Sequence, residues 1–295
     1  MNWYPSRRAG LLVGLVLLIA LGFADYLLVN RIRGSAVDLV LFGRALLLVV
    51  TLPLAALLVY ACWGLVGLAY HMERNGIVVR WAAHHDVVPI ADVVEAVPLT
   101  VHGGQLVGGL GWPGYRFGWA RLEGVGPVRV YVTRTSGRLL LIRTRGTALL
   151  LSPVDVDGFL ADYRARRALG PIARWTLGLQ LPGLLALSIW RDSLALVSLT
   201  PGLALNLALT GYLAARYQNL PPRLMLSFDP QGFGDRIAPG KELFLFPTIG
   251  LGILLVNLLL AALIHRRERV LARLLAANVP VMHILLWVTV VRLLG

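Results

Sequence analysis

Long apolar runs constrain this sequence more than any other feature. They extend from Leu11 to Val29, Leu39 to Tyr70, Trp175 to Trp190, Leu194 to Ala215, Leu243 to Ile264, and Leu274 to Leu294. A helix needs about 20 apolar residues to cross a hydrocarbon core of about 30 Å. Since 57% of the residues are hydrophobic and 15% are charged, we predict an integral membrane protein with about six transmembrane helices.

The first run also fits a secretory signal peptide. Arg7 and Arg8 precede its apolar part, and Gly22, Phe23 and Ala24 form a passable cleavage site. The apolar residues nevertheless continue to Val29, which favours an uncleaved helix.

A water-facing β domain is predicted between Tyr70 and Trp175, where short apolar runs are separated by Gly, Pro and Asp. Polar turns containing glycine fit hairpin connections there. The predicted strands lie near residues Gly76–Ala82, Val87–Ile90, Val93–Val97, Phe117–Leu122, Val128–Thr133, Leu139–Arg143 and Thr147–Leu151.

A helix should close this domain. Ser152 can cap it, Pro153 suits its first turn, and Asp155 places a carboxylate at the positive end of the helix dipole. The apolar residues after them recur with helical spacing and predict one buried stripe: Val156, Phe159, Leu160 and Tyr163.

His84, His85 and Asp86 stand side by side and could form either a turn or a metal or catalytic site. Adjacent strand residues point to opposite faces, whereas a metal needs convergent ligands, so the pattern favours a turn. Cys62 is the only cysteine, which excludes a cysteine-based metal cage. We predict no metal, no cofactor and no catalytic residues, and therefore a protein that is not an enzyme.

The segment GLGWPGYRFGW contains a GxGxxG pattern, but the strand and helix that a dinucleotide site requires are missing around it. Its Trp112, Tyr115, Arg116 and Phe117 suit the bilayer interface or a partner groove. The alternation of aromatic residues is also typical of one face of a strand.

Asp25 and Arg44 are ionisable residues inside predicted spans, where charges are costly and usually paired. They lie at similar depths below the same membrane surface if the first two spans form an antiparallel hairpin. We predict a structural Asp25–Arg44 ion pair.

Three segments, YHMERNGIVVRWAAHHDVVPIADVVEAVP, GLGWPGYRFGWARLEGVGPVRVYVT and LLLSPVDVDGFLADYRARRALG, together resemble a membrane-linked bacterial pleckstrin-homology (PH)-like domain. The resemblance implies a bent seven-stranded antiparallel barrel or sandwich capped by a C-terminal helix. It also implies a role in binding or signalling.

Residues 219 to 294 are similar to the membrane domain of unknown function in SdpI-type immunity proteins, on the segment NLPPRLMLSFDPQGFGDRIAPGKELFLFP and two later apolar runs. Family positions for Pro, an aromatic residue, Gly and Asp match Pro222, Phe228, Gly232 and Asp235. The candidate binding residues of this loop are Phe228, Asp229 and Asp235.

The predicted fold class is an α+β membrane protein with one inserted PH-like β domain. Residues 1–70 form a transmembrane hairpin, 71–170 the PH-like domain, 171–218 a transmembrane helix pair, and 219–295 a loop with a further transmembrane pair. The expected function is that of a non-enzymatic interaction or sensing module, and the alternative is a transporter-like or toxin-immunity protein regulated by that domain.

The expected partners are the lipid bilayer and a protein, a peptide or a lipid head group. Nucleic acid is not expected, although the formal charge is +13, because the arginines collect beside apolar spans. The expected location is the bacterial inner membrane. With six spans, the β domain and the loop of residues 216 to 242 lie on the same side of the membrane. The Lys and Arg count favours the cytoplasm for that side. The immunity-type resemblance implies the opposite, because in that family the loop faces outward.

Overall fold

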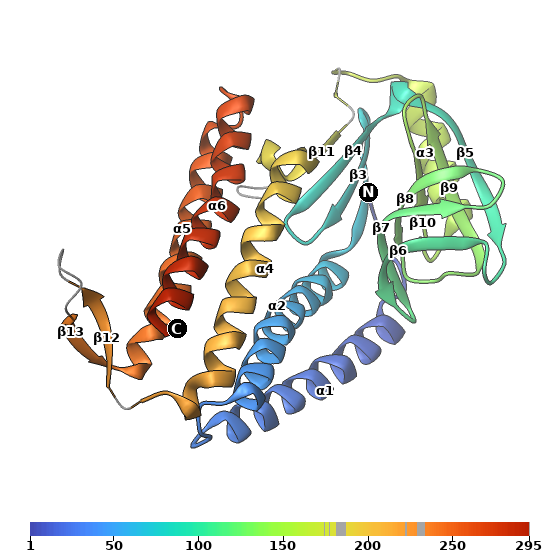
Figure 1. The fold of residues 1–295 in the computed structure, drawn as a ribbon. Coiled ribbons are helices and arrows are strands. Elements are labelled where there is room, and N and C mark those ends of the chain that lie inside the picture. The colour runs from blue at the N-terminus through green and yellow to red at the C-terminus, as the bar shows by residue number, and fades with distance from the viewer. Residues whose placement is uncertain (174, 177, 181–186, 222, 229–233, 295) are drawn as a thin grey trace. The chain divides into compact units, whose positions relative to one another are not determined.

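The computed structural model describes residues 1–173, 175–176, 178–180, 187–221, 223–228 and 234–294 (Figure 1). Its contacts divide the chain into two compact units, which we describe separately. The β unit comprises Met1–Tyr26 and Thr51–Gly183, and the helical unit comprises Leu27–Val50 and Leu184–Gly295.

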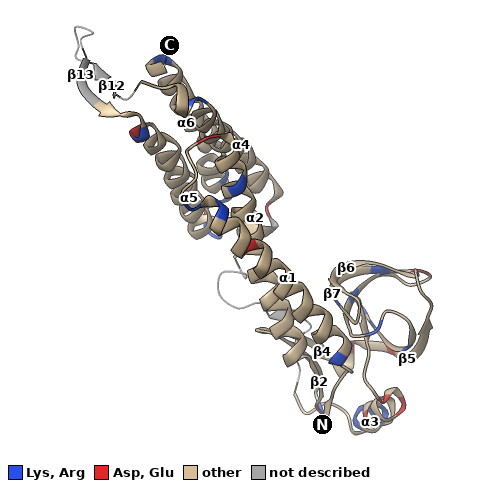
Figure 2. Cartoon of the chain, turned by 90° about the horizontal axis from the view of Figure 1, so that it is seen from below, with Lys and Arg blue, Asp and Glu red and all other residues tan. Residues whose placement is uncertain are grey.

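Five helices in the described part of the chain are long and apolar enough to cross a membrane. They are α1 (Arg8–Ile32), α2 (Leu39–Gly67), α4 (Ser193–Arg216), α5 (Leu245–Ile264) and α6 (Arg269–Leu294). Charged residues are sparse along them and stand mostly near their ends (Figure 2). These helices indicate a multi-pass membrane protein.

The predicted span from Trp175 to Trp190 is not an α-helix in the residues described. Gly178–Gln180 form strand β11, and Ser188–Arg191 form a 3-10 helix, while residues 181–186 lie outside the described part. The apolar run is shorter than the usual span and is interrupted by Gly178 and Pro182, which weaken a helix. The described residues therefore contain five candidate spans instead of six.

The β unit contains two sheets. The first has the order β1 (Asn2–Trp3), β2 (Ala69–Met72), β3 (Gly76–Trp81), β4 (His84–Pro89) and β11. The second has the order β5 (Val93–Val101), β9 (Gly137–Thr144), β10 (Ala148–Leu151), β8 (Gly126–Val132), β7 (Tyr115–Leu122) and β6 (Leu106–Trp112). Together they form a β-sandwich.

All seven predicted strands correspond to observed ones, with shifted ends. Strand β6 was not predicted, because its sequence LVGGLGW is rich in glycine, which is uncommon inside strands. One pairing also differs from the antiparallel arrangement that the resemblance implies, since β10 inserts between β9 and β8 and runs parallel to β8.

The central strands of the second sheet, β9, β10 and β8, are buried on both faces. On β8, Tyr131 packs into the cluster that also contains Tyr70 and Phe159, whereas Val130 and Val132 pack into a second cluster on the opposite face. This follows from the two-residue alternation of a strand.

Helix α3 (Val156–Leu169) buries the predicted stripe. Its cap differs from the prediction, because Asp155 Oδ1 accepts a hydrogen bond from the Gly158 amide at 2.8 Å, while Ser152 Oγ accepts one from the Thr133 amide at 2.9 Å. Asp155 is the residue directly before the helix, so its carboxylate reaches the first turn.

The turn between β3 and β4 lies before the histidines and not, as was predicted, at them. Ala82 and Ala83 form it, with Ala82 at φ 47°, and His84, His85 and Asp86 already belong to β4. His84 and Asp86 are buried and His85 is half-buried, in line with strand alternation. Among the described residues, no group of three His, Cys, Asp or Glu could hold a metal ion.

In the helical unit, α4, α5 and α6 pack against one another through small residues. A Cβ on Gly250 would overlap Asn206 Nδ2, and Gly202 lies against Val279. Asn206 Nδ2 donates to the Pro247 carbonyl oxygen at 2.9 Å and lies 3.3 Å from His283 Nε2. Strands β12 (Arg223–Phe228) and β13 (Gly234–Pro239) form a separate hairpin.

Candidate functional site

An apolar groove of about 530 Å³ lies in the β unit, between the first two helices and the β6–β7 hairpin. The residues that line it recur with the same sequence spacing on both helices. They are Leu17, Ala20, Leu21 and Ala24 on α1, and Leu54, Leu57, Leu58 and Ala61 on α2. This i, i+3, i+4, i+7 pattern places each set on one helix face. The alanines leave space that leucines would fill.

The hairpin supplies the third wall through Leu110, Gly111, Trp112 and Phe117. Trp112 Nε1 donates a hydrogen bond to the Gly10 carbonyl oxygen at 2.6 Å, which attaches the hairpin to the start of α1. The two backbones also meet at Gly114, whose Cβ would lie 2.7 Å from the Gly10 nitrogen. Two glycines therefore permit the approach that forms the groove.

Two of the four predicted hairpin residues, Trp112 and Phe117, line this groove. Tyr115 has no exposed surface and accepts a hydrogen bond from Trp81 Nε1. Burial raises the pKa of the Tyr115 hydroxyl far above its usual value, so it stays neutral. Arg116 donates to the Leu106 carbonyl oxygen at 2.9 Å across the hairpin.

Two of the aromatic residues that alternate along β7 form a buried stack with Trp81. Phe117 stacks on Trp81 at 4.4 Å between ring centroids and on Tyr115 at 5.3 Å. The contact between Phe117 and Trp81 packs the β6–β7 hairpin against β3 of the first sheet.

A buried ion pair lies inside the β unit and was not predicted. Arg129 Nη1 lies 2.8 Å from Asp86 Oδ2, and Tyr131 donates its hydroxyl to the same oxygen at 3.3 Å. In the part of the chain that the structure describes, Asp86 Oδ1 and Arg129 Nε are buried without a hydrogen-bond partner. Burial raises the pKa of Asp86 to about 6, outweighing the lowering by Arg129.

The sequence indicates that each residue of this pair lies in a strand, but it does not indicate that the two residues meet. Asp86 stands in the strand segment HHDVVP and Arg129 in PVRVYV, each among residues that alternate with the strand period. Because the two strands belong to different sheets, their pairing could not be read from local spacing.

The remaining predicted residues are not brought to the groove. Phe228 ends β12 and Asp235 lies in β13, while Asp229 lies outside the described residues. Arg44 Nη1 donates to the Arg31 carbonyl oxygen and to Ser35 Oγ, both at 3.3 Å. The Asp25–Arg44 ion pair stays a prediction.

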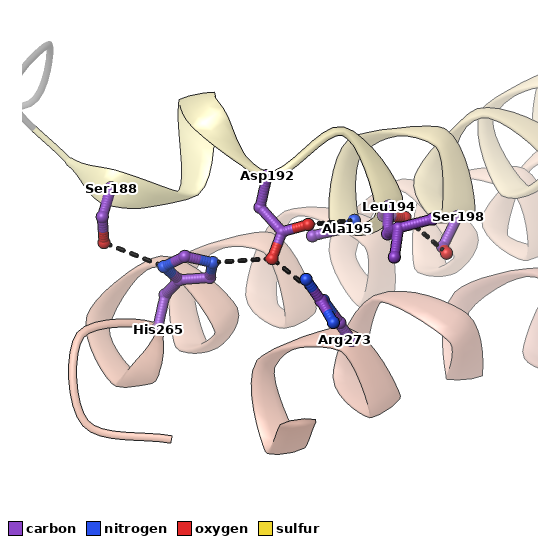
Figure 3. A network of polar contacts seen from close by, with 7 residues as sticks. All are labelled: Ser188, Asp192, Leu194, Ala195, Ser198, His265 and Arg273. Atoms are coloured by element: carbon purple, nitrogen blue, oxygen red, sulfur yellow. Dashed lines mark hydrogen bonds and ion pairs between the residues drawn. The ribbon is translucent and has the colours of Figure 1, made fainter. Parts of the chain in front are cut away.

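A polar network in the helical unit was also missed (Figure 3). Ser188 Oγ lies 2.8 Å from His265 Nδ1, His265 Nε2 lies 2.9 Å from Asp192 Oδ2, and Arg273 Nε donates to that same oxygen at 3.0 Å. These bonds hold the pKa of Asp192 well below its usual value. Asp192 also caps α4 by accepting from the Ala195 amide.

The order serine, histidine, aspartate occurs in serine hydrolases as well. Here the Asp192 carboxylate also binds Arg273 and the first turn of α4. A structural role, in which the network joins the ends of three helices, therefore explains these contacts. One hint was visible in the sequence, namely the basic segment HRRER between two apolar runs.

Comparison with known proteins identifies the β region. Residues 68–167 match the bacterial PH domain family. No curated protein and no solved structure matches the chain. The chain is thus a membrane protein that carries a bacterial PH-like module, and the immunity-type resemblance of residues 219–294 stays a prediction.

Proposed function

We propose that the PH-like module is a non-enzymatic interaction module that holds the acyl chain of a membrane lipid in the apolar groove. The observation that carries this proposal is the composition of the groove, whose walls come from two candidate membrane spans and from the module itself. An acyl chain bound in this groove attaches the PH-like module to the surrounding bilayer.

The lining residues support an acyl chain as the occupant. Leu17, Leu54 and Leu57 are 41%, 51% and 49% exposed, and only 11% and 6% of the residues in the most apolar stretches of α1 and α2 are buried. Apolar surface of this extent is covered by lipid when the helices cross a bilayer. The groove is continuous with that surface, so a lipid tail enters it without leaving an apolar environment.

We further propose that the module lies in the cytoplasm. With five spans, an even number of crossings separates the module from the α5–α6 turn, so both share one side. That short turn carries Arg266 and Arg267, and the start of α6 adds Arg269 and Arg273. Arginines clustered in short loops and at the adjoining helix ends are typical of the cytoplasmic side. The β12–β13 hairpin then faces the other side.

A photoreactive phosphatidylcholine with a diazirine in its acyl chain tests the groove. We expect the whole protein in nanodiscs to become labelled at Leu110 and Trp112 of β6 and at Phe117 of β7. Leu21→Trp, which fills the groove, should lower this labelling severalfold. Leu15→Trp, on exposed surface of the same helix, should not.

Equal labelling of the hairpin in both variants, or none in the unmodified protein, would reject the acyl-chain site. The transporter-like or immunity role is the alternative in which the membrane helices act and the module regulates them. Unchanged activity of a Leu21→Trp variant in a transport or toxin-protection assay, despite lost labelling, would favour that alternative.

A further inference from the structure

The ends of three apolar helices enclose a second pocket, of about 380 Å³, in the helical unit. It is lined by residues at the start of α4, just after α5 and at the start of α6: Ser188, Asp192, Ser193, Leu194, His265, Arg269 and Arg273. Since each of these helices is a candidate span, the pocket lies where apolar helix surface gives way to water.

The pocket has a polar and basic lining that the helical packing holds in place. Arg269 and Arg273 are one turn apart and so share a face of α6. Arg273 is 44% exposed on its side chain although its Nε binds the buried Asp192. Asp192 therefore orients one guanidinium group toward the pocket without removing it from solvent.

We propose that this pocket binds the phosphate group of an anionic membrane lipid. Guanidinium groups match phosphate oxygens in geometry and charge, and the hydroxyl of Ser193 adds a donor of the kind that phosphate accepts. Basic pockets between transmembrane helices at the membrane surface favour lipid head groups, because the acyl chains can lie along the adjoining helices. This site is separate from the acyl-chain groove, and neither proposal depends on the other.

Arg269 is the residue through which the proposal can be tested without disturbing the fold. It is exposed and lines the pocket, whereas Asp192 contacts Arg273 and His265. Arg269→Gln removes one charge and leaves that network in place. Arg292→Gln is the matched control, since Arg292 is an exposed arginine at the other end of the same helix.

The experiment is native mass spectrometry of the whole protein released from nanodiscs of phosphatidylcholine and phosphatidylglycerol. We expect retained phosphatidylglycerol in the unmodified protein and in Arg292→Gln, and about fivefold less in Arg269→Gln, as one basic contact at a membrane surface is worth about 1 kcal/mol. Inorganic phosphate in excess should displace little of the lipid, because it lacks the acyl chains.

Equal retention by the two variants would overturn the proposal. Complete displacement by inorganic phosphate would overturn its lipid part and assign the pocket to a soluble phosphate compound. A loss of signal in both variants would show adsorption to general surface charge and would also contradict the site.

Discussion

Trp112 and Gly10 join the PH-like module to the first span, through the indole N–H of Trp112 and the carbonyl oxygen of Gly10. The contact requires close approach of two backbones, because a Cβ on Gly10 would lie 2.5 Å from the Gly114 carbonyl oxygen. The geometry of the acyl-chain groove therefore depends on glycine at position 10.

Gly10→Ala should displace the hairpin from α1. Overpacking at a close contact costs about 1–3 kcal/mol, and hydrogen exchange of the β6 and β7 amides in the intact protein should become faster. Gly22→Ala is the control in the same helix, because a Cβ there meets nothing within 4 Å. Faster exchange in both variants, or in neither, would contradict this account of the contact.

The buried Asp86–Arg129 pair should make the stability of the β unit depend on pH. The pKa of Asp86 is raised to about 6 from 3.8, so its contribution to stability is complete below about pH 4 and is lost as the pH rises through 6. A shift of this size corresponds to about 3 kcal/mol.

Arg129→Met should destabilise the β unit more at pH 8 than at pH 5, because the carboxylate is then buried without a counter-ion. We expect a loss of about 3–5 kcal/mol at pH 8, measured by hydrogen exchange of the β4 and β8 amides after correction for the intrinsic rate. Arg143→Met is the matched control, since its pair with Glu95 is exposed and 3.6 Å long. A loss independent of pH would be inconsistent with the raised pKa.

Gly250 should be required for packing of the three C-terminal helices. Its Cβ would overlap Asn206 Nδ2 and lie 3.0 Å from His283 Nε2, so Gly250→Ala should break the hydrogen bond from Asn206 to Pro247 and lower the melting temperature of the detergent-solubilised protein. Gly252→Ala, in the same helix with nothing within 4 Å, should leave it unchanged. Similar melting of the two variants would refute the packing argument.

Asp192 should act both as a helix cap and as an anchor for two cationic partners. Asp192→Asn keeps a capping side chain but loses the charge, whereas Asp192→Ala loses both. We expect faster amide exchange at the start of α4 in Asp192→Ala than in Asp192→Asn, and faster exchange at the start of α6 in both. An unchanged α6 in Asp192→Asn would rule out the anchoring role of the Arg273 bond.

Five spans and six spans predict different topologies. On a Cys62→Ser background, Ser136→Cys in the module and Gln218→Cys after α4 can be labelled with an impermeant thiol reagent in intact cells. Five spans with a cytoplasmic module predict protection at 136 and labelling at 218. The same result at both positions would restore the sixth span.

The sequence by itself determined the elements whose signals are local. Apolar runs of sufficient length predicted the five helices, the period of two predicted seven strands, and the stripe of α3 followed from helical spacing. The run from Trp175 to Trp190 was misleading because composition alone does not distinguish a short apolar helix from an apolar strand such as β11.

Tertiary structure decided which distant residues meet. Asp86 and Arg129 lie on strands of different sheets, Trp112 reaches Gly10 across about a hundred residues, and Asp192 is bound by a helix end far along the chain. Such contacts depend on how elements pack, which no local periodicity encodes. The acyl-chain groove and the phosphate pocket therefore became visible only in the folded chain, although every residue that lines them was readable beforehand.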